Sequence, residues 1–137
     1  MRYLLDTNLC IEVIRGRRHD IIDRFRAHRH HSLCISAITY AELQYGCSKS
    51  SDPERHRHLL ERFLLPCTVE DFPVSAGLWY GIVRSNLECR GCPIGPNDLL
   101  IAAHALASSS VLVTNNTREF ARIPDLIVED WATPSSA

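Results

Sequence analysis

A short apolar run near the start of the chain ends abruptly in three polar residues. Tyr3-Leu4-Leu5 has the length and composition of a buried strand. Asp6-Thr7-Asn8 follows it, and a helical pattern begins at Leu9. The sequence therefore puts a carboxylate at the carboxyl end of a first strand, which is where open α/β sheets bind ligands. A simpler interpretation is that Asp6 or Thr7 only caps the following helix.

Further apolar runs alternate with helical patterns along the chain. They predict strands at 33–35, 111–113 and 126–128, with a weaker one at 67–69, and helices at 9–16, 20–29, 37–47, 53–65, 75–89, 97–106 and 117–121. This alternation predicts an α/β fold, a three-layer sandwich with a mostly parallel central sheet. We expect one domain over 1–132 and a disordered small-residue tail over 133–137.

For two of these helices, the apolar residues predict which side of the helix faces the core. In the helix at 37–47 we expect Ile38, Ala41 and Tyr45 to face inward, with Glu42 at the margin of that stripe. In the helix at 75–89 the expected inward residues are Leu78, Ile82 and Val83. A carboxylate at the edge of a buried stripe is costly unless something pairs with it, although a glutamate there can also reach solvent.

Other polar residues stand where Asp6 stands, at the edges of apolar segments. Thr114-Asn115-Asn116 ends the run at 111–113, and Glu119 shares a helical face with Asn116. Asp98 falls in the first turn of a buried helix, where favourable interaction with the helix dipole is the simpler explanation. His104, nearly two turns further along, is expected to be a hydrogen-bonded core histidine rather than a catalyst.

The predicted topology brings these polar groups together. Asp6 and Asn116 would end neighbouring strands, Glu42 follows the second strand, and Asp98 precedes the strand that leads to Asn116. Clustered carboxylates repel one another unless a cation neutralises them. Because the set offers oxygen and no His or Cys, it favours Mg²⁺ or Mn²⁺ over Zn²⁺.

Charge and composition exclude some classes of protein. The net charge of −1 is not typical of a nucleic-acid-binding protein, but residues 15–31 are locally basic, and Arg15, Arg17 and Arg18 are candidates for RNA phosphate contacts. A solvated helix face is the alternative. No apolar run approaches the roughly 18–20 residues of a membrane span, and no secretory leader is recognisable, so a cytoplasmic protein with reduced core thiols is expected.

The ordered set of motifs resembles a known family. Leu4-Leu5-Asp6-Thr7-Asn8, Tyr40-Ala41-Glu42-Leu43, Pro96-Asn97-Asp98 and Val113-Thr114-Asn115-Asn116 look like the successive motifs of PIN-domain nucleases, over roughly 1–131. They most resemble the toxin ribonucleases of VapBC toxin–antitoxin pairs. Each motif alone is weak, whereas the ordered set is specific.

The resemblance implies a function and a set of roles. Asp6, Glu42 and Asp98 would hold the metal and carry catalysis, while Asn116, in place of the family's frequent fourth acid, and Glu119 could complete the site. Residues that would orient ligands or waters are Thr7, Asn8, Ser36 and Thr114. It also implies a homodimer, a small VapB-type antitoxin in the active-site groove, and metal-dependent cleavage of RNA, with the anticodon region of initiator tRNA as the expected substrate.

Other families fit the sequence less well. A haloacid-dehalogenase-type phosphotransferase needs a second Asp two residues after Asp6, where this chain has Asn8. A receiver domain needs a lysine near the last strands, and the only lysine is Lys49. A non-catalytic PIN-like module that binds RNA or protein stays open, because the fourth acid is replaced and the net charge is near zero.

Overall fold

The structure, a computed structural model, describes residues 1–132, so the predicted tail at 133–137 lies outside the described residues. Five strands form one sheet in the order β3-β2-β1-β4-β5, and every neighbouring pair is parallel. The strands are β1 (Arg2–Leu5), β2 (Ser32–Ser36), β3 (Cys67–Glu70), β4 (Val111–Val113) and β5 (Val128–Glu129). All their carboxyl ends therefore meet at one edge of the sheet.

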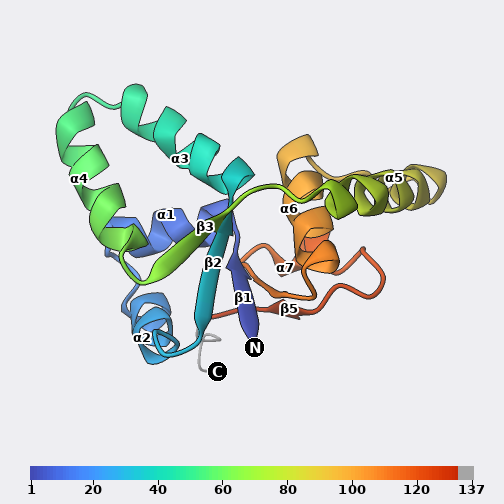
Figure 1. Cartoon of the computed structure of the whole chain (residues 1–137), viewed down its shortest axis with the longest axis horizontal. Coiled ribbons are helices and arrows are strands. Elements are labelled where there is room, and N and C mark those ends of the chain that lie inside the picture. The colour runs from blue at the N-terminus through green and yellow to red at the C-terminus, as the bar shows by residue number, and fades with distance from the viewer. Residues whose placement is uncertain (133–137) are drawn as a thin grey trace.

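Helices cover both faces of this sheet (Figure 1). They are α1 (Thr7–Arg15), α2 (His19–Ala27), α3 (Ala37–Ser48), α4 (Pro53–Leu64), α5 (Val74–Cys89), α6 (Pro96–Ala107) and α7 (Thr117–Phe120). The core is divided by the alternation of strand side chains. Tyr3 and Leu5 pack in a cluster with residues of α1 to α4, whereas Leu4 packs with residues of α5 to α7. The predicted three-layer α/β sandwich is confirmed.

Local sequence signals determine several helix ends. Ser36 caps α3 by accepting a hydrogen bond from the amide of Ile38 at 3.1 Å, as its position predicts. Asp52 caps α4 with Pro53 in the first turn. Gly16 ends α1 in a left-handed conformation with φ 72°. The last strand was predicted at 126–128 and instead begins at Val128, because the chain comes alongside β4 only after the turn at Asp125.

The inward faces predicted for two helices are wrong in part. In α3 the buried residues are Thr39, Leu43 and Cys47, while Tyr45 is 66% exposed. Apolar side chains lie on two sides of α3. The sheet covers the side that also contains Thr39, and the hydroxyl of Thr39 lies beside that of Thr7 in the interior.

In α5, Val83 is buried as predicted, together with Ala76 and Leu87. Leu78 and Ile82, in contrast, are 70% and 54% exposed. They lie on the side of α5 that α6 does not cover, so this helix presents an apolar stripe to solvent.

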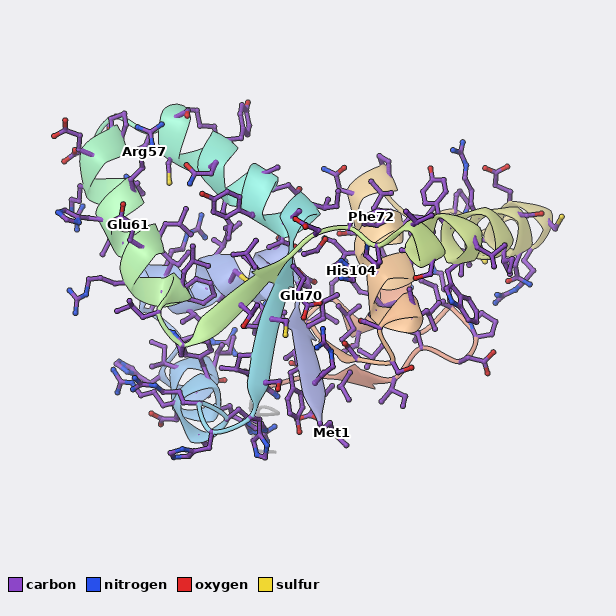
Figure 2. The ribbon with its side chains drawn as sticks, viewed as in Figure 1. Met1, Arg57, Glu61, Glu70, Phe72 and His104 are labelled. Carbon is purple, nitrogen blue, oxygen red and sulfur yellow. The ribbon has the colours of Figure 1, made fainter. Side chains whose placement is uncertain are left out.

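His104 is a buried member of a polar network, as the sequence predicts. Its side chain is 1% exposed, and Nε2 lies 3.4 Å from Oε2 of Glu70, which also pairs with Arg2. Figure 2 shows His104 of α6 beside Glu70 at the end of β3, with Phe72 close by, and the Phe72 ring meets the imidazole edge-on. This network ties α6 to the edge of the sheet.

The cysteines and the helix lengths fit the sequence analysis. All six cysteines are free thiols, and three of them, Cys10, Cys34 and Cys47, are buried. Within residues 1–132, no helix is both long and apolar enough to cross a membrane.

Candidate active site

Asp6 lies at the junction of β1 and α1 with no exposed surface. Its carboxylate accepts the amide of Asn8 at 2.5 Å, which caps α1, and its other oxygen accepts the hydroxyl of Thr114 at the end of β4. Both interpretations of the Asp-Thr-Asn segment therefore hold, because one carboxylate caps the helix and also faces the neighbouring strand. Burial raises the pKa of Asp6, although these hydrogen bonds oppose the shift.

Glu42 reaches the same place from α3. One of its oxygens accepts the hydroxyl of Thr7 at 2.7 Å, and the other accepts the side-chain amide of Asn97 at 3.2 Å. The Thr7 hydroxyl is also 3.1 Å from that of Thr39. Neither Asn97 nor Thr39 was assigned a role from the sequence. The sequence feature that could have indicated Asn97 as part of the site is its position next to Asp98, in the first turn of a helix.

Asp98 stands in the first turn of α6 and interacts with all the other acids of the group. Burial, followed by the charges of Asp6, Glu119 and Glu42, raises the pKa of Asp98 to about 6. Charges from Asp6 after β1, Glu42 on α3 and Glu119 on α7 contribute to this shift after burial, so these three acids lie near Asp98. The predicted convergence of Asp6, Glu42 and Asp98 is thus observed.

The residues after β4 complete this group. The Thr114 hydroxyl accepts the backbone amide of Asn116 at 2.9 Å, so Thr114 links Asn116 to Asp6. The Asn116 side chain donates to Glu119 at 3.0 Å, which holds Glu119 toward Asp98. Ser36, in contrast, uses its hydroxyl to cap α3.

The donor set fits a hard divalent cation. Asp6, Glu42, Asp98 and Glu119 offer only oxygen, and their mutual repulsion raises the pKa of Asp98. Among residues 1–132, no group of three or more acidic, His or Cys side chains is spaced to hold a metal ion. Mg²⁺ does not require one, since it usually binds one or two carboxylates and keeps several waters.

Two of the acids, Glu42 and Asp98, lie at one end of a groove of about 1010 Å³ between α1, α3 and α4, whereas Asp6 and Glu119 are not among the residues that line it. Glu42, Asn97 and Asp98 line that end, and the wall between the helices is apolar, with residues such as Ile11, Ile14, Ile38 and Leu59. Of the arginines proposed for RNA contacts, Arg15 and Arg17 line the groove. Arg18 is not among its lining residues and pairs with Asp20 at 2.8 Å.

The sequence matches the PIN domain family over residues 3–126, with the acids described above inside the match. The chain belongs to the PIN-domain family. Within that family it is similar to ribonuclease VapC2 of Rickettsia felis, 43% identical over 132 residues, which are 96% of this chain and 98% of that protein. It is also 42% identical over 131 residues to the tRNA(fMet)-specific endonuclease VapC of Salmonella typhimurium, covering 96% and 98% of the two chains.

Solved structures of this PIN-domain group superpose closely. VapBC2 from Rickettsia felis, bound to a DNA fragment from its promoter, gives a TM-score of 0.91 at 42% identity over 96% of this chain and 99% of that one. DNA-bound VapBC from Salmonella typhimurium gives 0.90 at 42% identity, with the same coverage. The resemblance to the VapC toxins of VapBC pairs is confirmed, and this chain is a VapC-type PIN domain.

Proposed function

We propose that this PIN domain is a Mg²⁺- or Mn²⁺-dependent endoribonuclease in which Asp6, Glu42 and Asp98 hold the metal. The proximity of these three acids, two of which line an open groove, is the observation that carries the proposal. The names of the relatives, ribonuclease and endonuclease, support the same activity. Asn116 and Glu119, joined by a hydrogen bond, stand where they could contribute further oxygen ligands.

The reaction is hydrolysis of a phosphodiester. The oxygen of a water forms a new bond to phosphorus, one existing P–O ester bond breaks, and the leaving oxygen ends as a hydroxyl. A bound Mg²⁺ would supply positive charge for the developing negative charge and would make the water a better nucleophile. Thr7 and Thr114 hold the carboxylates of Glu42 and Asp6 in fixed orientations.

The proposed substrate is tRNA, and specifically the anticodon region of initiator tRNA. The support is the name of the Salmonella relative, a tRNA(fMet)-specific endonuclease that is 42% identical to this chain. A tRNA substrate also agrees with the proposed cytoplasmic location and with the reduced thiols of the core.

Incubation with a purified tRNA pool tests the activity. The wild type should cut one class of tRNA with Mg²⁺ and none with EDTA, and mapping of the new ends should locate the cut. Asp6→Asn, Glu42→Gln and Asp98→Asn should each lower the rate by at least about 100-fold. Asp23→Asn, on the exposed face of α2, is the matched control and should cut normally. Full cleavage by Asp98→Asn, or no cleavage by the wild type, would exclude the assignment.

The alternative, a non-catalytic PIN-like module, makes a different prediction for metal binding. A functional site should raise the melting temperature as Mg²⁺ is added, since binding to the native state stabilises it by mass action. A degenerate site with Asn116 in place of an acid should show no such rise.

The proposed partner is a VapB-type antitoxin that occupies the groove. Similar chains have been solved as VapBC complexes, and the apolar wall of the groove suits a peptide with apolar side chains. Adding the antitoxin at equal concentration should suppress tRNA cleavage and protect the amides of α1 and α3 from hydrogen exchange. Cleavage that continues undiminished would exclude the groove as its binding site.

We further propose a homodimer that uses the exposed stripe of α5. Val74, Leu78 and Ile82 are spaced one helical turn apart and are 96%, 70% and 54% exposed. Leu78→Glu should convert the dimer to a monomer in sedimentation experiments. Ile127→Glu is a matched control, because Ile127 is 66% exposed but lies outside α5. Equal dissociation by both variants, or by neither, would contradict the assignment of this surface.

A further inference from the structure

An exposed aromatic side chain lines the groove away from the acids. Tyr45, on α3, is 66% exposed and belongs to the groove wall. The ammonium of Lys49, one turn later on α3, lies 5.0 Å from the centroid of the Tyr45 ring. The ammonium therefore lies over a face of the ring. Such a pair can bind a nucleotide, because a base can replace the cation over the ring while the long lysine side chain turns to the phosphate.

The charges of the groove are separated along its length. Both α1 and α3 begin at the carboxyl edge of the sheet, where the acids lie, and run outward from it. At about 1.5 Å per residue, Arg15 lies roughly 13 Å along α1 from Asp6, and Lys49 lies roughly 10 Å along α3 from Glu42. Arg17 and Arg55 line the same outer half of the groove. One end of the groove is therefore anionic and the other cationic.

The outer half is held in place by contacts between α3 and α4. The guanidinium of Arg57 on α4 donates to the hydroxyl of Ser48 at the end of α3, at 2.9 Å. The side chain of His56, which also lines the groove, is 2.6 Å from the hydroxyl of Ser50 in the connecting loop. Figure 2 shows Arg57 at the top of α4, beside the end of α3. Lys49 lies between these two contacts, which hold its backbone in place.

The outer half of the groove, with its cations and exposed ring, suits single-stranded RNA, whereas the apolar wall between the helices suits the antitoxin peptide proposed above. An apolar peptide would bring no anion to Arg17, Lys49 and Arg55, whereas a nucleotide strand supplies one phosphate per residue. Arg15 already lies 3.9 Å from Glu12 and is not counted among them. A base-paired duplex would not serve, because its bases are stacked on each other and cannot lie on the face of Tyr45.

We propose that Tyr45 and Lys49 form a subsite for an unpaired nucleotide of the RNA substrate, with the base on the Tyr45 ring and the flanking phosphates near Lys49, Arg17 and Arg55. The proposal rests on the proposed function for the identity of the ligand. It adds that the strand crosses the outer half of the groove, so that a segment several nucleotides from the cut contributes to binding. An unpaired loop is then required on that side of the scissile bond.

Fluorescence anisotropy with a labelled single-stranded RNA of about 10 nucleotides tests the subsite. The titration is done in EDTA, and a denaturing gel confirms that the RNA stays intact. Tyr45→Ala should raise the Kd by about 5- to 100-fold, while Tyr45→Phe should keep the wild-type value because the ring remains. Tyr40→Ala is the matched control, since Tyr40 is an exposed tyrosine of α3 that is not among the lining residues of the groove. Lys49→Gln should reduce the dependence of log K on log salt by about 0.7.

Several results would overturn the proposal. They are an unchanged Kd for Tyr45→Ala, an equal loss for Tyr40→Ala, or a duplex RNA that binds as tightly and with the same sensitivity to Tyr45. If Tyr45→Ala weakens only the antitoxin and not the RNA, the outer half of the groove is a protein site instead. Failure of the nuclease assignment is a separate result, because it is seen as uncut tRNA with the wild type and Mg²⁺, whereas the subsite is measured without cleavage.

Discussion

Replacing Asp98 by Asn should stabilise the protein in the absence of metal. Burial and the neighbouring carboxylates raise the pKa of Asp98 from 3.8 to about 6, a shift of about 2 units. At about 1.36 kcal/mol per unit, ionising Asp98 costs the native state about 3 kcal/mol. Asp98 is only half-buried, so solvent screening together with the favourable interaction of the charge with the N-terminus of α6 offsets about 1 kcal/mol. The neutral amide avoids the remaining cost of about 2 kcal/mol, which should raise the Tm by about 6 °C.

The stability gained by Asp98→Asn should depend on pH, in a direction set by the raised pKa of Asp98. The pKa of Asp98 is higher in the folded than in the unfolded protein, so its contribution to stability is fully present below about pH 3.8 and is lost as the pH rises through about 6. The advantage of Asp98→Asn over the wild type should therefore be largest near pH 8. Near pH 5 it should be about half as large, because Asp98 is then mostly protonated in the native state.

Thermal melting of the wild type, Asp98→Asn and Asp23→Asn, in EDTA at about pH 5 and about pH 8, measures these differences. Asp23 is exposed on α2, so its replacement should leave the Tm nearly unchanged. Adding Mg²⁺ should raise the Tm of the wild type and close the gap, since the cation relieves the same repulsion. A variant that melts below the wild type near pH 8, or with the same gain at both pH values, would refute the reasoning.

Three further substitutions test the supports of the site and the fold. Thr114→Val should lower the free energy of unfolding by about 1–3 kcal/mol in urea titrations and weaken stabilisation by Mg²⁺, because Asp6 loses a buried hydrogen bond. Glu70→Gln should destabilise the protein near neutral pH and less so in acid: burial opposes the shift, but hydrogen bonds from Cys34 and Arg2 lower the pKa of Glu70, so the stabilisation is lost as the pH falls. Gly16→Ala should cost about 1 kcal/mol in the same titrations, because φ is 72° at that position.

The parts of the site that could be predicted are those at the ends of buried strands. Asp6 and Thr114 each follow a run of three apolar residues, and such runs indicate both a strand and its end. A parallel sheet puts both ends at the same edge, and because β1 pairs with β4 they are adjacent and joined by the observed hydrogen bond. Local pattern and one rule of topology therefore predicted that these polar residues meet at one edge of the sheet.

The helix faces and the polar contacts between helices could not be predicted in this way. Both α3 and α5 carry apolar residues on more than one side, so periodicity does not tell which side meets the sheet. Tyr45 and Leu78 were placed inside for this reason and are exposed. Asn97 was missed because its partner, Glu42, is 55 residues away and is reached only through the packing of α6 beside α3.

Net charge gave little information about function here, because opposite charges are separated along one groove. The whole chain has a charge of −1, which is not typical of an RNA-binding protein. Yet the acids near the start of α1 and in the middle of α3, with the cations that end these helices, create a local field along the groove. A bound anion responds to that field rather than to the total charge. A divalent cation at the acidic end would remove the repulsion there and leave the groove cationic throughout. Metal binding and RNA binding should therefore be coupled. Mg²⁺ should tighten the binding of RNA to the control variant Asp23→Asn, whose acidic site is intact, far more than to Asp98→Asn.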